Sequence, residues 1–247
     1  MASPPPPIEI FDEIDSTNAE ARRRAEAGET GPLWIAALRQ TAGRGRRGRT
    51  WETGAGNLAA TFLTRSEKPP AEAAQVSFVA ALAVADLAAE FVPAGLISLK
   101  WPNDPLIGGR KAAGILVESG PHPVGGLWLA VGCGVNLATP PQAPERPATA
   151  FAEHMRGPPP PAPEALNFLV ESFERWRGLW ERQGFAPIAE AWTARAEGLG
   201  RACTVRLPAE TVNGVAEGLD VDGALRLRTA SGLVRRITAG DVFFGGP

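Results

Sequence analysis

The pattern of apolar residues changes near Gly200, and that change limits the folds open to this chain. After Gly200, short segments of alternating apolar and polar residues are separated by Asn-Gly and Asp-Gly pairs, which are the residues of tight β-hairpin turns. Before it, apolar strands and helices follow one another without regular strand–helix–strand alternation, which favours an α+β domain over a doubly wound sheet. We therefore expect an α+β domain over residues 1–198 and a small antiparallel barrel over residues 199–247.

The larger region has the apolar patterning of strands and buried helices. Strands are expected at residues 8–16, 33–38, 57–64, 96–101, 112–119 and 126–137, and helices at residues 17–28, 71–91, 164–182 and 187–197. The first helix is expected to have Thr17 as its N-cap, Glu20 in a capping box and Gly28 at its end. The stretch from Ala138 to Pro163 is rich in proline and cannot be regular structure throughout.

Composition argues against several classes of protein. The net charge of −2 is unlike that of a general nucleic-acid binder. No apolar run is expected to approach the ~20 residues of a membrane span, and the N-terminus lacks the regions of a signal peptide, so a cytoplasmic protein is expected. Cys133 and Cys203 fit neither a disulfide framework nor a zinc site. His122 and His154 lie in proline-flanked loops, which argues against a histidine-centred triad or metal site.

Residues 43–49, "GRGRRGR", place four arginines and three glycines between two apolar strands, with no acidic residue among them. Glycine lets backbone amides approach an anion closely, and arginine binds phosphate through two hydrogen bonds. The spacing is not that of a Walker loop. Phosphate binding is favoured somewhat over two alternatives, a solvated surface loop and an Arg-Gly segment that binds RNA without sequence preference.

Lysine is rare among the 25 basic residues: it occurs at Lys68, Lys100 and Lys111, and two of these lie in "KWPNDPLIGGRK". Lysine and arginine are not interchangeable, so these positions favour a requirement for an ammonium group. Asp104, in the turn between them, is a reasonable ligand for Mg²⁺ beside a phosphate. A hairpin turn with a surface salt bridge is an equally good interpretation. Asn136, after "GCGV", is either a turn residue or a contact for an adenine edge.

The order of these motifs carries more information than any one of them. "DSTN", "QTAGRGRRGRTW", "KWPND", "RKAAGIL" and "GCGVN" follow in succession and closely resemble the biotin–protein ligase family (biotin–[acetyl-CoA-carboxylase] ligases). The resemblance covers Ile10 to about Asn136, and the C-terminal segment resembles the family's small SH3-like domain. It implies a mixed-sheet, biotin/lipoate ligase-like catalytic domain followed by an SH3-like β-barrel.

The resemblance also implies an activity and its partners. The chain is expected to convert biotin and ATP, with Mg²⁺, into biotinyl-5′-AMP. It would then transfer biotin to one lysine of a biotin carboxyl carrier protein domain of a biotin-dependent carboxylase. Because the motifs begin within twenty residues of the start, we expect a ligase without the DNA-binding domain of bifunctional members. Both a monomer and a homodimer are compatible with the family.

Individual roles follow residue by residue from the matching motifs. The implied biotin-binding residues are Ser16, Thr17, Asn18, Gln40, Arg44, Gly45, Lys111, Gly114 and Gly132. The implied ATP- or adenylate-binding residues are Arg44, Arg46, Arg49, Trp51, Lys100, Asn103 and Asn136. Lys111 and Arg46 are implied to be catalytic, and Asp104 to be the Mg²⁺ ligand.

Three other interpretations compete with a biotin ligase. A lipoate or octanoate ligase would share the fold and the adenylation chemistry, but the sequence Ser16-Thr17-Asn18 favours a site for a ureido ring. A noncatalytic RNA- or nucleotide-binding module is disfavoured by the acidic pI near 5.8. An inactive relative is disfavoured because both motif lysines are present. Pro105 departs from the aliphatic residue usual after "KWPND", and no loss of function is expected from it.

Overall fold

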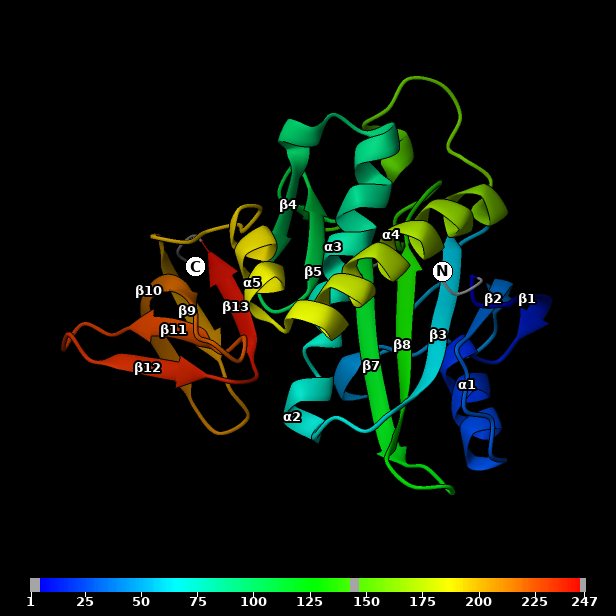
Figure 1. The fold of residues 1–247 in the computed structure, drawn as a ribbon. Coiled ribbons are helices and arrows are strands. Elements are labelled where there is room, and N and C mark those ends of the chain that lie inside the picture. The colour runs from blue at the N-terminus through cyan, green and yellow to red at the C-terminus, as the bar shows by residue number, and fades with distance from the viewer. Residues whose placement is uncertain (1–4, 143–146, 245–247) are drawn as a thin grey trace.

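The computed structural model describes residues 5–142 and 147–244. Figure 1 shows a larger domain, built on a long sheet crossed by helices, beside a smaller domain of strands at the C-terminal end. The α+β class predicted for the larger domain is confirmed, and so is an antiparallel β domain after it. The boundary between residues 198 and 199 stays a prediction.

The large domain is organised on a five-stranded mixed sheet with strand order β1-β2-β3-β8-β7. Its strands are β1 Ile8–Ile14, β2 Leu33–Gln40, β3 Leu58–Ser66, β7 Ala113–Pro121 and β8 Leu127–Val135. β1 pairs with β2 in parallel, and every other neighbouring pair is antiparallel. The sequence-based strand positions in this sheet agree with the structure to within a few residues.

Successive side chains on a strand point to opposite faces of a sheet, and here both faces are covered. Trp34 and Phe62 point to the face covered by α3 (Val76–Phe91) and α4 (Ala162–Gln183), where their rings pack with Phe173 at centroid distances of 5.2 and 4.9 Å. Their neighbours in the sequence point to the other face and pack against α1 (Thr17–Glu26). The sheet is therefore the middle layer of three.

Shorter elements complete the large domain. They are η1 Arg46–Gly48, α2 Pro70–Ala73, η2 Ala94–Leu96, η3 Phe151–Glu153 and α5 Ala186–Thr193, with a three-stranded sheet of β4 Ile97–Lys100, β5 Asp104–Ile107 and β6 Arg110–Lys111. The described part of the proline-rich stretch is irregular apart from η3, a bridge at Ala148 and its last two residues, which begin α4. This agrees with the prediction, and residues 143–146 lie outside the described residues.

The C-terminal domain is one antiparallel sheet with strand order β12-β11-β10-β9-β13. Its strands are β9 Ala202–Arg206, β10 Thr211–Leu219, β11 Leu225–Arg228, β12 Val234–Ile237 and β13 Asp241–Phe244. The two domains share one apolar core. At their junction the indole Nε1 of Trp101 donates a hydrogen bond to the carbonyl oxygen of Gly223 at 3.0 Å. The small domain is thus packed against the large one beside α3 and α5.

Two details of the first helix differ from the sequence-based prediction. The N-cap is Ser16, not Thr17: Ser16 has extended dihedral angles and its Oγ accepts a hydrogen bond from the backbone N–H of Ala19 at 3.4 Å. Both residue types are good N-caps, so the sequence did not separate them. Glu20 forms no capping box, because its carboxylate binds Arg23 and Arg24 at 2.9 Å.

The sequence analysis expected no apolar run as long as a membrane span, and this expectation was wrong. Residues Pro70–Phe91, which form α2 and α3, are long and apolar enough to cross a membrane by those two measures alone. However, 67% of the apolar window is buried inside the protein. α3 packs on α4 and on the inner face of the sheet, which makes this segment a core helix.

Candidate active site

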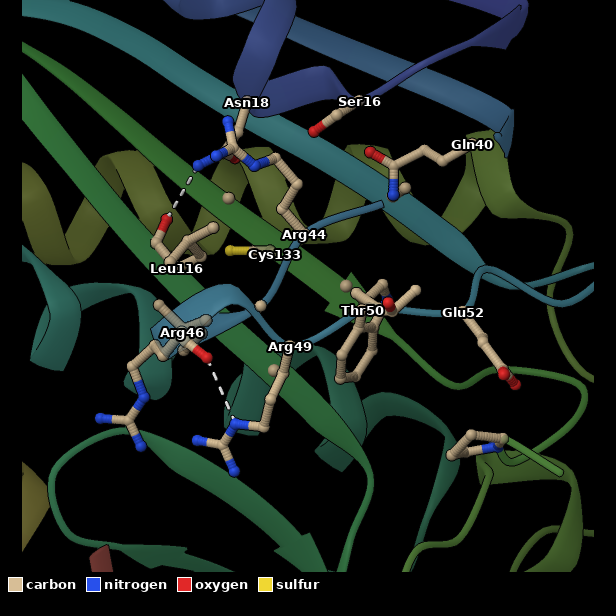
Figure 2. Close-up of a pocket in the computed structure, with 18 of the residues that line it drawn as sticks. Ser16, Asn18, Gln40, Arg44, Arg46, Arg49, Thr50, Glu52, Leu116 and Cys133 are labelled. Carbon is tan, nitrogen blue, oxygen red and sulfur yellow. Dashed lines mark hydrogen bonds between the residues drawn. The ribbon is translucent and has the colours of Figure 1, made fainter. Parts of the chain in front are cut away.

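A cavity of about 500 Å³ opens beside the C-terminal end of β8. Figure 2 shows Ser16 and Gln40 on one side of it and Arg46 and Arg49 on another. The sequence-predicted residues that line it are Ser16, Thr17, Asn18, Gln40, Arg44, Gly45, Arg46, Arg49, Trp51, Lys111, Gly114, Gly132 and Asn136. Lys100, Asn103 and Asp104 do not line it but lie behind Lys111, on the β4–β5 hairpin.

At one end of the cavity, hydroxyl and amide side chains at the start of α1 form a polar network that extends to the carboxylate of Glu118. The backbone N–H of Thr17 donates to Gln40 Oε1 at 2.8 Å, and the Gln40 amide donates to Thr53 Oγ1 at 3.0 Å. Asn18 Nδ2 donates to Glu118 Oε2 at 2.9 Å and to the carbonyl oxygen of Leu116 at 3.3 Å, the latter drawn in Figure 2. Because helix α1 begins directly after β1, these short polar side chains are buried at the sheet.

Thr61 completes this network and was missed by the sequence analysis. It is fully buried in the middle of β3, and its hydroxyl lies 2.7 Å from both Thr17 Oγ1 and Asn18 Oδ1. A hydroxyl can donate one hydrogen bond and accept others, so Thr61 can fix the orientations of both side chains at once. A threonine in a buried apolar strand was the available signal.

Glycines on β7 and β8 form the floor of the cavity because larger residues would not fit there. A Cβ on Gly134 would lie 2.2 Å from the indole Nε1 of Trp51, and one on Gly114 would lie 2.6 Å from the same ring. A Cβ on Gly132 would lie 2.1 Å from Asn18 Oδ1. The floor therefore holds Trp51 and Asn18 against the strands and leaves the space above them open.

Two lysines share one buried carboxylate behind the cavity. Asp104 is 2% exposed, and its two oxygens lie 2.5 Å from Lys111 Nζ and 3.0 Å from Lys100 Nζ. The β4–β5 and β5–β6 pairings bring the three residues together. Burial alone would raise the pKa of the Asp104 carboxyl, but the two ammonium groups outweigh burial and hold that pKa well below its usual range. Asp104 is thus ionised and directs Lys111 at the cavity edge.

This arrangement does not support the predicted role of Asp104 as a magnesium ligand. Each of its oxygens already faces an ammonium group, and a metal ion there would be repelled by both lysines. Over residues 5–142 and 147–244, no group of three or more His, Cys, Asp or Glu side chains could hold a metal ion. The residues present therefore do not fit a magnesium ion held by the protein alone.

The arginine loop closes the remaining side of the cavity. Its two ends are joined by backbone hydrogen bonds, from Gly45 N to Arg49 O at 2.7 Å and from Trp51 N to Gly43 O at 2.9 Å. Arg46 and Arg49 line the cavity, and the Arg49 Nε donates to the Arg46 carbonyl oxygen at 3.2 Å (Figure 2). The loop therefore presents guanidinium groups at the cavity from a closed hairpin, and its phosphate-binding role stays a prediction.

Comparison with known proteins decides the family. Residues 10–136 match the biotin/lipoate A/B protein ligase family, and residues 198–245 match the biotin protein ligase C-terminal domain. The chain belongs to this family. It is 44% identical to the biotin–[acetyl-CoA-carboxylase] ligase of Paracoccus denitrificans over 94% of this chain and 98% of that protein.

More distant members of the family show the same relation. The chain is 30% identical to the bifunctional ligase/repressor BirA of Bacillus subtilis, over 95% of this chain and 73% of that protein. The solved structure of the Aquifex aeolicus biotin protein ligase in complex with biotin and ATP superposes with a TM-score of 0.80. It is 25% identical and covers 96% of this chain and 97% of that chain.

The shared carboxylate gives a prediction about stability. Asp104→Asn leaves two ammonium groups facing a neutral amide, and we expect it to lower the free energy of unfolding at pH 7 by roughly 3 kcal/mol. Because the folded-state pKa of Asp104 is depressed, the stabilisation is complete above its unfolded pKa of about 3.9. It is lost progressively as pH falls toward the folded value.

Urea unfolding of both proteins between pH 7 and pH 2 measures this difference. It should be constant above about pH 5 and shrink below about pH 4. A difference that stays constant down to pH 2, or no difference at pH 7, would contradict the assigned ion pairs. Asp12→Asn, an exposed aspartate on β1, is the matched control.

Proposed function

We propose that this chain is an ATP-dependent biotin–protein ligase. It would join biotin to the α-phosphate of ATP, release pyrophosphate, and transfer biotin from biotinyl-5′-AMP to one lysine of a biotin carboxyl carrier protein domain. The observation that carries this proposal is a single cavity lined both by hydroxyl and amide side chains from the start of α1 and by lysine and arginine side chains. The name of the Paracoccus relative supports the same activity.

The neutral end suits the ureido ring of biotin, which offers two N–H donors and one carbonyl acceptor. Ser16, Thr17 and Gln40 present hydroxyl and amide groups that can both donate and accept. Asn18 would complete the site, held in place by Thr61. A lipoate ring has no such groups and would displace water from these polar side chains without offering them hydrogen bonds in return, which costs binding energy. This difference favours biotin over the alternative of lipoate or octanoate.

The cationic end suits the reacting groups. The biotin carboxylate and the triphosphate carry charges of the same sign, so positive side chains are needed to bring them together and to stabilise the transition state. We assign Lys111 and Arg46 to the carboxylate and α-phosphate. Arg44 and Arg49 would hold the phosphates, with ATP arriving as its Mg²⁺ complex. The magnesium then travels with the triphosphate, which suits a site without a carboxylate cluster.

The adenine end is assigned to the remaining predicted residues. The ring of Trp51 lies over the glycine floor, where a second flat ring could stack on it. Asn136 is buried and its amide is fixed by a hydrogen bond to the carbonyl oxygen of Thr149 at 3.0 Å. Asn103 has a buried Oδ1 without a hydrogen-bond partner in the structure, and a nucleotide could supply one. Lys100 contributes through Asp104.

No covalent enzyme intermediate is needed for this chemistry. Cys133 lines the cavity, but burial raises the pKa of its thiol to about 12. The thiolate, which is the nucleophilic form, is therefore scarce at neutral pH. The acyl group would pass directly from biotinyl-5′-AMP to the acceptor lysine. We propose a cytoplasmic enzyme that acts as a monomer or homodimer and does not bind DNA.

Mass spectrometry of the purified protein incubated with Mg-ATP and either biotin or lipoate tests this proposal. We expect biotinyl-5′-AMP with release of pyrophosphate, and no lipoyl-AMP. Lipoyl-AMP in place of biotinyl-AMP would keep the adenylation mechanism and overturn the substrate. If folded protein forms neither adenylate, that result would contradict a ligase and favour a nucleotide-binding module.

Lys111 gives a second prediction. Lys111→Ala removes a positive charge that would stabilise the negative charge of the transition state. We therefore expect single-turnover formation of biotinyl-AMP to slow by ~10²-fold or more. Lys68→Ala is the matched control, because Lys68 pairs with Glu72 on α2, away from the cavity. Wild-type adenylation in folded Lys111→Ala would overturn the assignment.

A further inference from the structure

The arginine loop of the large domain converges on one acidic residue of the C-terminal domain. Asp241, the first residue of β13, is 7% exposed and lies 194 positions from Arg47 in the sequence. Arg47 Nη1 donates a hydrogen bond to Asp241 Oδ2 at 3.1 Å. The guanidinium groups of Arg46 and Arg49 lie 3.6 and 3.9 Å from Asp241 Oδ1. A buried carboxylate from the other domain therefore faces the loop that borders the cavity.

The three arginines differ in their distance from Asp241 and in whether they line the cavity. Arg46 and Arg49 line the cavity and approach Asp241 at distances longer than a hydrogen bond. Arg47 does not line the cavity, and its contact with Asp241 is a direct hydrogen-bonded ion pair. Charge-assisted hydrogen bonds are stronger than neutral ones. Arg47 is thus placed to anchor the loop, while Arg46 and Arg49 border the cavity.

The backbone of Arg47 supports an anchoring role. Its φ of 58° and ψ of 34° place it in the left-handed region. Among the described residues, no other residue except glycine has a positive φ. Side chains other than glycine rarely adopt this conformation unless their surroundings hold them there. The ion pair with Asp241 is one such constraint, and it directs the Arg47 side chain out of the cavity toward the C-terminal domain.

We propose that Asp241 is a positioning residue for the arginine loop. It anchors Arg47 throughout the reaction and acts as the counter-ion of Arg46 and Arg49 until the phosphates of the substrate take its place. The proposal rests on the proposed ligase function. It gives the C-terminal domain a part in holding ATP and retaining the acyl-adenylate, although none of that domain's residues up to Phe244 lines the cavity.

Limited proteolysis tests the anchor without using the reaction. Trypsin cleaves after arginine, and cleavage in a loop follows the population of its open form. Asp241→Asn keeps the shape of the side chain and removes its charge, so we expect cleavage at residues 44–49 to be about 10-fold faster, the effect of losing one charged hydrogen bond. Arg47→Ala should give a similar increase at the remaining arginines, and the double variant no more than either alone.

The cleavage rates of the two single variants decide whether the Arg47–Asp241 contact anchors the loop. Wild-type cleavage rates in Asp241→Asn and in Arg47→Ala would overturn the proposal. Arg47 is half-exposed, so Arg47→Ala keeps the test valid even where Asp241→Asn reduces the stability of the fold. Asp222→Asn is the matched control: it removes a C-terminal carboxylate paired with Arg236, away from the loop, and should leave cleavage in the loop unchanged.

Steady-state kinetics then separates positioning from a general structural effect. In Asp241→Asn we expect the KM for ATP to rise about 10-fold with a smaller fall in kcat, and biotinyl-AMP to escape into solution faster. Asp241→Glu should restore part of the loss. A fall in kcat with an unchanged KM and unchanged adenylate release would contradict positioning. If the wild-type protein forms no adenylate, the proposed function fails, while the proteolysis result still decides the contact.

Discussion

Two anions have to meet in one cavity, and the arrangement of charge in this protein follows from that requirement. The cations at the cavity would repel one another without compensation. The structure supplies a buried carboxylate to each group: Asp104 lies between Lys100 and Lys111, and Asp241 lies among the arginines of the loop. Each carboxylate is held on a strand end of a different small sheet. Positive charge is thereby fixed at the cavity edge without an excess of it over the whole protein.

The central sheet supports this arrangement. Alternating side chains on β2 and β3 fill the two apolar layers, so the sheet is rigid on both faces. At one end of the sheet, β7 and β8 carry glycines in place of larger residues, and these glycines form the floor of the cavity. The start of α1 then brings short polar side chains to the neutral end. The core and the site are thus two ends of the same strands.

Much of this was predictable because it depends on neighbours in the sequence or on motif order. The central strands, the glycine-rich arginine loop and the adjacency of Lys100, Asp104 and Lys111 follow from local patterns. The choice of Ser16 over Thr17 as the N-cap was mispredicted, although serine is the slightly better N-cap residue, because both residue types cap helices and they are adjacent in the sequence. Thr61 and Asp241 were not predictable either. Their partners lie 43 to 194 positions away. A threonine in an apolar strand can suggest a buried polar role, but the strand patterns do not identify the partners of either residue.

The most direct test of the account is a crystal structure of the protein with biotinyl-5′-AMP. The ureido ring should lie within hydrogen-bond distance of Thr17 and Gln40, and the acyl-phosphate beside Lys111 and Arg46. Arg47 should still be bound to Asp241. The opposite orientation of the adenylate, or its binding outside this cavity, would contradict the separation into a neutral end and a cationic end on which the account depends.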